Sequence, residues 1–78
     1  MDIKIAILDS LIDDDETIVQ IQNYLRFLKI YVGLDDISCL IKSMIEEKLV
    51  PINEDISDND FVWYKISEKG KEFWEKAT

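Results

Sequence analysis

The segments Leu49-Val50-Pro51-Ile52 and Phe61-Val62-Trp63-Tyr64-Lys65-Ile66-Ser67-Glu68-Lys69-Gly70, separated by an acidic loop, decide the fold of this chain. The first segment leaves a helix, and its Pro51 lacks an N–H donor, so we expect an edge strand there. The second segment is dense in strand-forming residues up to Ile66. Ser67 can then cap a closing helix. The pattern predicts a β-hairpin over 49–66 and a C-terminal helix over 68–77.

Three helices are predicted before the hairpin, over about 3–12, 16–32 and 36–48, because apolar residues recur there at helical spacing. Asp2 can cap the first helix, and Asp13 with Glu16 loosely resembles a capping box at the start of the second. Gly33 is placed to end the second helix in the left-handed conformation. Either of the next two acids can cap the third helix. The expected caps of the third helix are Asp35 and Asp36.

The second predicted helix carries more apolar surface than a small core needs. Beside its main stripe lies a second stripe made by Tyr24, Phe27 and Tyr31. A small domain can wrap such a helix on both sides. Alternatively, this second stripe is a surface for a homodimer or a protein partner.

The composition is that of one small, acidic, globular domain. The chain has 78 residues, 17 acidic and 9 basic, and a net charge of −8. This charge opposes non-specific binding to nucleic acid or to anionic membranes. The single cysteine, Cys39, allows no internal disulfide and fits a reducing cytoplasm. No apolar run is long enough to span a membrane.

From Asp35 onward the chain resembles the winged helix-turn-helix superfamily, in particular the MarR and PadR transcription regulators. The third helix, the run Glu46-Glu47-Lys48-Leu49-Val50 and the segment Trp63-Tyr64-Lys65-Ile66-Ser67-Glu68-Lys69-Gly70 carry the resemblance. Lys48 stands where these families usually have Gly, and Ser67 where they have Thr. The resemblance implies three helices, a two-stranded wing and a C-terminal helix in one domain, 1–78, of mainly α class with a small β-hairpin.

The resemblance also implies that the third helix faces DNA, which makes Ser38, Lys42, Ser43 and Lys65 the candidate nucleic-acid contacts. The negative charge of the third helix and the wing loop instead argues against DNA binding. The wing loop holds four acids and no base before Lys65, and such a loop repels a phosphate backbone. These acids are instead candidates for a surface that meets a protein partner: Glu54, Asp55, Asp58 and Asp60.

The chain lacks the residues that most catalytic and metal sites need. It has no histidine, and Cys39 has no second cysteine with which to hold a metal or share redox chemistry. The acidic runs at Asp13 and Asp55 lack the glycine that a calcium loop requires. With two glycines in the chain, a phosphate-binding loop is not expected either. We therefore expect no enzyme activity, no cofactor and no metal.

Two functions follow from the sequence. The first is a small cytoplasmic transcription regulator of bacterial or phage type, which acts by binding DNA as a homodimer. The alternative is an acidic winged-helix module, or a DNA mimic, that binds a protein and not DNA. Family resemblance favours the first, and the charge of the third helix and wing favours the second.

Overall fold

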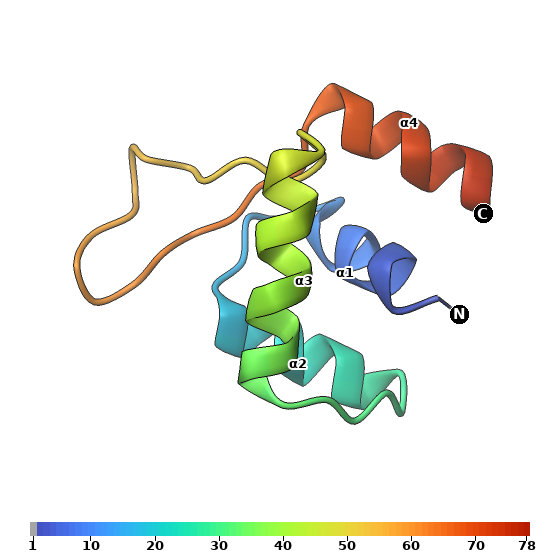
Figure 1. The fold of residues 1–78 in the computed structure, drawn as a ribbon, viewed down its shortest axis with the longest axis horizontal. Coiled ribbons are helices and arrows are strands. Elements are labelled where there is room, and N and C mark those ends of the chain that lie inside the picture. Colours follow the sequence, from blue (N-terminus) through green and yellow to red (C-terminus); the bar gives the residue numbers. More distant parts are fainter. Residues whose placement is uncertain (1) are drawn as a thin grey trace.

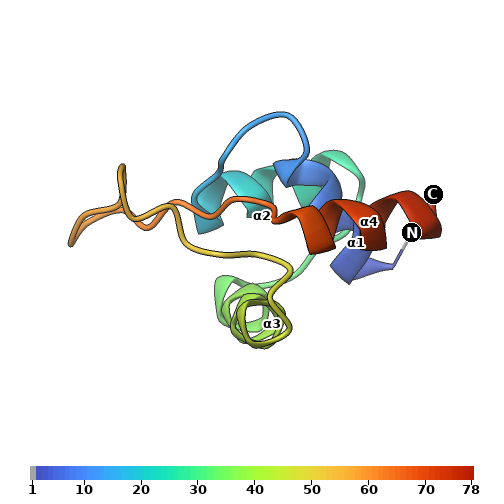
Figure 2. The same cartoon turned by 90° about the horizontal axis from the view of Figure 1, so that it is seen from above.

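The computed structural model describes residues 2–78, which form four helices around one hydrophobic core (Figure 1). The helices are α1 (Ile3–Leu11), α2 (Ile18–Phe27), α3 (Leu34–Glu46) and α4 (Glu68–Ala77). Helix α1 packs against α2 and α4, and α3 packs against α2. Seen from above, α3 lies apart from the layer that holds the other three helices (Figure 2). The mainly helical class predicted from the sequence is confirmed.

The core is formed by the apolar faces of the first three helices and by Leu49 and Val50, which lie shortly after α3. Helix α1 is the most deeply buried, with Ala6, Ile7 and Leu8 fully inaccessible to solvent. This explains why the helix is apolar on nearly every side. The other core residues are Ile5, Leu11, Ile21, Leu25, Ile37, Ile41, Met44, Leu49 and Val50.

Helix α2 is shorter than the predicted 16–32, at both of its ends. It starts at a capping box in which Thr17 and Gln20 exchange hydrogen bonds, so the predicted box of Asp13 and Glu16 is wrong. It ends in a Schellman motif: the Ile30 N–H donates to the Leu25 carbonyl (2.8 Å) and the Lys29 N–H to the Arg26 carbonyl (2.9 Å). Residues 28–33 are irregular, and Tyr31 therefore lies outside the helix.

The expected role of Gly33 was also wrong. Lys29 is the residue in the left-handed conformation, with φ 63°, whereas Gly33 has an ordinary φ of −74°. Gly33 is the N-cap of α3, and it makes no side-chain cap. Asp35 and Asp36 are consequently not caps but lie in the first turn of α3, where negative charge favours the exposed N–H groups.

The segment 49–66 projects from the helices as a long loop whose two arms run antiparallel (Figure 1). The arms keep one register: the Asn53 N–H donates to the Trp63 carbonyl (2.8 Å) and the Lys65 N–H to the Pro51 carbonyl (3.0 Å). Yet residues 2–78 contain only isolated bridges, Ile52 with Tyr64 and Glu16 with Tyr64. The predicted two-stranded sheet is therefore not confirmed. We call segment 49–66 the wing.

Helix α4 closes the structure over α1. Ser67 caps it as predicted, since its Oγ accepts from the Gly70 N–H (2.9 Å). Gly70 is buried, and a Cβ there would lie 2.4 Å from the Leu49 carbonyl oxygen, so the helix approaches the backbone closely. Trp74 is partly buried and donates its indole N–H to an oxygen of Asp9 (2.9 Å).

Candidate nucleic-acid interface

Helix α3 presents three of the four predicted DNA contacts. Ser38 is half-buried, while Lys42 and Ser43 are exposed. Ser38 and Lys42 are four residues apart and therefore share one face of the helix. An ammonium and a hydroxyl are groups that hydrogen-bond to phosphates and base edges. The exposed face of α3 thus has hydrogen-bonding groups but little positive charge.

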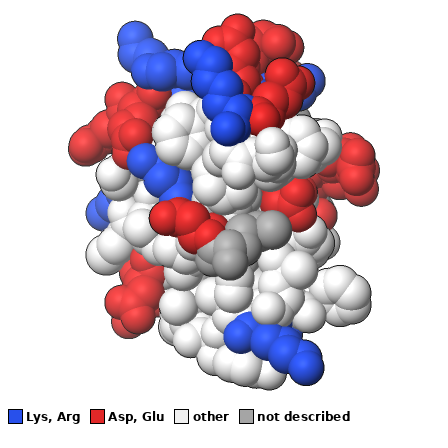
Figure 3. Space-filling model, turned by 90° about the vertical axis from the view of Figure 1, so that its right-hand side faces the viewer, with Lys and Arg blue, Asp and Glu red and all other residues white. Residues whose placement is uncertain are grey.

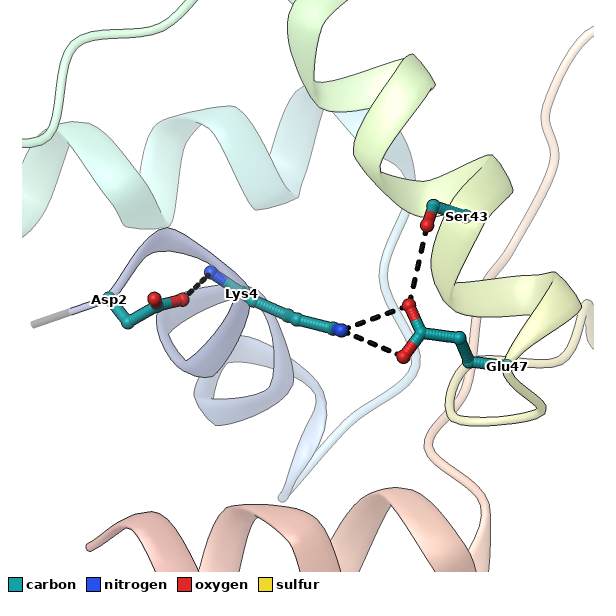
Figure 4. A network of polar contacts seen from close by, with 4 residues as sticks. All are labelled: Asp2, Lys4, Ser43 and Glu47. Carbon is teal, nitrogen blue, oxygen red and sulfur yellow. Dashed lines mark hydrogen bonds and ion pairs between the residues drawn. The ribbon is translucent and has the colours of Figure 1, made fainter.

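Ser43 belongs to a polar network at the C-terminal end of α3 (Figure 4). Its Oγ donates to Glu47 Oε1 (3.3 Å), and Lys4 Nζ donates to both Glu47 oxygens, at 2.9 and 2.8 Å. The hydrogen bond from Lys4 is the main reason that the pKa of Glu47 lies below its ordinary value. One of the few bases on this side is therefore already matched by an acid of the same chain.

Lys65, the fourth predicted contact, is exposed on the returning arm of the wing. No hydrogen bond or ion pair within residues 2–78 joins it to the three α3 residues. The wing acids Glu54, Asp55, Asp58 and Asp60 are all exposed. Each of the two surfaces, α3 and the wing, therefore carries several acids and one lysine that forms no ion pair within residues 2–78.

The side of the molecule near α4 and the chain ends offers no more favourable surface for binding a phosphate backbone. On the face in Figure 3, toward α4 and the chain ends, bases and acids are interspersed with uncharged residues. Lys71, for example, lies 3.8 Å from Glu68 on the same helix. A continuous basic patch, the usual mark of non-specific DNA binding, is not seen on this face.

The predicted dimer or partner surface divides into two parts. Tyr24 is partly buried and donates its hydroxyl to Asp9, which also accepts from Trp74. The hydrogen bond to Asp9, with burial and nearby negative charge, raises the pKa of Tyr24 to about 12. Phe27 and Tyr31 are instead 80% and 75% exposed. Tyr24 is thus engaged within the chain, and Phe27 and Tyr31 form the apolar surface that remains.

The sequence did not reveal the role of Asp9. The sequence does show a charged side chain in a mostly apolar helix, which can indicate a buried polar contact. The partners of Asp9, Tyr24 and Trp74, lie 15 and 65 residues away and could not be read from this pattern. Asp9 also lines an acidic cavity of about 490 Å³ with Asp13, Asp14 and Glu16. Burial, then the charges of Asp14 and Asp15, raise the pKa of Glu16. Within residues 2–78 no three His, Cys, Asp or Glu residues are grouped so as to hold a metal ion.

The fold is shared with solved transcription regulators. The structures that resemble it include Bacillus subtilis PadR in complex with operator DNA (TM-score 0.81, 18% identity) and a PadR-family regulator from Clostridium difficile (TM-score 0.82, 20% identity). BldR from Sulfolobus solfataricus is also similar (TM-score 0.79, 21% identity). Each match covers at least 95% of this chain. The winged-helix fold predicted from the sequence is therefore confirmed.

This chain corresponds to only part of each of these similar proteins. The chain spans 46% of the B. subtilis protein, 50% of BldR and 81% of the C. difficile protein. No protein-family model matches the chain, and no curated protein matches it either. None of the helices within residues 2–78 is long and apolar enough to cross a bilayer.

Proposed function

From the winged-helix fold that these comparisons establish, we propose that the chain is a small transcription regulator that acts by binding DNA and not by catalysis. One observation carries the proposal. Helix α3 holds Ser38, Lys42 and Ser43 on its accessible side, and a fold of this kind has been solved with operator DNA bound, in B. subtilis PadR. In this proposal α3 meets the major groove and Lys65 of the wing contacts a phosphate. The protein works in the cytoplasm and needs no cofactor.

The charge distribution sets the expected strength of binding. Lys42 and Lys65 supply two phosphate contacts per chain, and the exposed acids of α3 and the wing oppose them. A single chain should therefore bind DNA weakly at physiological salt, and a homodimer with two half-sites is needed for tight binding. The exposed Phe27 and Tyr31 side chains support such a dimer.

Selection from a pool of random duplexes by the purified protein tests the proposal. We expect enrichment of one site at low salt, and we expect Lys42→Glu to abolish it. Lys76→Glu is the matched control, because it makes the same change of charge on the exposed face of α4, away from α3 and the wing. Equal loss with both variants would mean that net charge alone governs binding. No enrichment by the unmodified protein at any salt concentration would reject the proposal.

The wing acids give a second test of the same interface. Asp58 accepts hydrogen bonds from the backbone N–H groups of Asp60 and Phe61, so its carboxylate also shapes the loop. Glu54 and Asp55 can be neutralised more cleanly, as Glu54→Gln with Asp55→Asn. If the wing lies against DNA, this double variant should bind any duplex more tightly.

The alternative role as a dedicated protein-interaction module or DNA mimic receives no support from the similar structures, which are regulators. We do not propose it as the main function. The groove described next concerns a binding site that a DNA-binding regulator can carry in addition.

A further inference from the structure

A groove separates the first turn of α2 from the returning arm of the wing. It has a volume of about 610 Å³ and is lined by residues 17–20 of α2, by residues 60–64 of the wing and by Ser38 of α3. Several of its apolar side chains are left open to solvent: Val19 is 51% exposed, Phe61 60% and Val62 39%. Apolar side chains gathered in this way around a concave surface are typical of a binding site.

The wing presents an open strand edge to this groove. Tyr64 is paired on that edge, because its N–H donates to the Glu16 carbonyl (2.8 Å) and its carbonyl accepts from the Glu16 N–H (3.1 Å). The backbone N–H and carbonyl of Val62, two residues before Tyr64, point to the same edge, because these groups alternate in direction along an extended chain. The N–H and carbonyl of Val62 have no hydrogen-bond partner within residues 2–78, since at Thr17 the neighbouring chain turns into α2. The edge is therefore unpaired where the groove begins.

The charges at the groove are of one sign. Asp60 lines it, and Asp58 lies in the same turn of the wing, to which it is tied by the N–H groups of Asp60 and Phe61 (both 2.8 Å). Neither carboxylate forms an ion pair within residues 2–78, and none of the residues that line the groove is basic. An occupant that complements this surface carries positive charge beside apolar side chains.

We propose that this groove binds an extended, cationic segment of a protein partner, added as a strand at the Val62 edge. The backbone of the segment pairs with the N–H and carbonyl of Val62, as in other cases of strand addition. Its apolar side chains pack against Phe61 and Val19, and its Lys or Arg side chains approach Asp58 and Asp60. Ser38 is the one residue that lines this groove and is also among the DNA contacts proposed above, and the peptide contacts described here do not use it.

Binding can be measured by fluorescence anisotropy with a short labelled peptide in which Lys alternates with Val. The unmodified chain should bind this peptide and bind it less tightly as salt rises. The same peptide with Glu in place of Lys should not bind. Asp60→Asn should weaken binding about two- to fivefold, the range of one exposed ion pair. Asp55→Asn is its matched control on the wing, because Asp55 does not line the groove.

Two further variants separate the groove from the wing as a whole. Val62→Pro removes the free N–H from the edge and should weaken binding more than Asp60→Asn does. Phe61→Ser should also weaken it, whereas Ile56→Ser, at a wing residue that is 51% exposed but outside the groove, should not. Circular dichroism spectra would show that each variant is folded.

The proposal is overturned if both members of either matched pair weaken peptide binding equally, because binding would then follow the charge or hydrophobicity of the wing in general. It is also overturned if Phe61→Ser and Val62→Pro leave peptide binding unchanged while weakening the binding of duplex DNA. In that case the groove belongs to the DNA interface. Failure of DNA selection, by contrast, would leave the peptide result intact.

Discussion

Gly70 is the residue whose replacement the packing tolerates least. A Cβ at this position would lie 2.4 Å from the Leu49 carbonyl oxygen and 2.8 Å from Ile66 Cγ1. Backbone cannot yield as a flexible side chain can, so Gly70→Ala should lower the free energy of unfolding by about 1–3 kcal/mol. Urea denaturation measures this change.

Gly33 is the matched control for the Gly70 prediction. A Cβ there meets nothing within 4 Å, and the residue is an N-cap with ordinary φ. Because Ser is a good N-cap, Gly33→Ser should leave stability unchanged or raise it by a few tenths of a kcal/mol. Similar losses for both variants would show that α4 does not sit as closely on Leu49 as described.

For Lys48 we predict the opposite of the effect at Gly70: replacing this residue by glycine should raise the stability of the protein. It adopts φ 64° after α3, where the Leu49 N–H donates to the Met44 carbonyl (2.9 Å) in a second Schellman motif. Left-handed backbone is unfavourable for a residue with a Cβ. After allowance for the greater freedom of glycine in the unfolded chain, Lys48→Gly should stabilise the protein by about 0.5–1 kcal/mol. Lys42→Gly, inside the same helix, should instead cost about 1 kcal/mol. Thermal unfolding of the two variants should therefore shift in opposite directions.

Tyr24 makes stability depend on alkaline pH. Its folded pKa, about 12, lies above the ordinary value of 10.0 because the neutral hydroxyl donates to Asp9. The resulting stability is complete below pH 10 and is lost as the pH rises toward 12. Tyr24→Phe should cost about 0.5–1.5 kcal/mol at neutral pH. It should also flatten the decline of stability between pH 10 and 12.

Two other tyrosines serve as references for the Tyr24 measurement. Burial raises the pKa of Tyr64 as well, so a smaller alkaline decline should remain in Tyr24→Phe. Tyr31→Phe controls for the loss of a tyrosine hydroxyl and should leave stability at neutral pH unchanged, because Tyr31 is 75% exposed. If Tyr24→Phe and the unmodified chain decline alike, the hydroxyl does not donate to Asp9 in solution.

At the scale of helices, sequence periodicity found all four but not all of their ends. Leu28 and Val32 continue the apolar spacing of α2, yet the helix stops at Phe27, because Lys29 takes the left-handed conformation that the sequence assigned to Gly33. A lysine carries no local signal for that conformation. The capping box of Thr17 and Gln20 was overlooked because the preceding aspartates also favour a helix start.

The wing shows a different limit of structure prediction from sequence. Its strand-forming residues predict a two-stranded hairpin, which is not confirmed, because the bridge between the arms is the isolated one of Ile52 with Tyr64. The wing also has partners far away in the sequence, since Tyr64 pairs with Glu16 on its other edge and the Asn53 side chain donates to Asp15 (2.6 Å). Contacts over such separations leave no periodic pattern. For the same reason the groove could not be foreseen from the alternation of 61–66 alone.

For the whole molecule, the exposed pair Phe27 and Tyr31 leads to a prediction about assembly. Both belong to the end of α2 and the irregular segment after it, and they are among the most exposed apolar side chains of residues 2–78. If they form a homodimer interface, light scattering should report twice the mass of one chain, 9.2 kDa, at tens of micromolar. Phe27→Ser with Tyr31→Ser should restore the monomer without loss of stability, because neither side chain is buried. A monomer at every concentration would remove the dimer from the proposed function.

The hydrogen bond between Trp74 and Asp9 has a consequence for how the chain folds during synthesis. It joins residues 65 positions apart, and α4 is one of the two helices that pack on α1. Helix α1 leaves the ribosome before α4, so the part of its apolar surface that α4 covers stays exposed until α4 has followed it. Native structure should therefore form late, in one step, after residues 68–77 have been made. Until then the nascent chain exposes part of its most hydrophobic helix, and we expect it to bind chaperones that hold apolar segments.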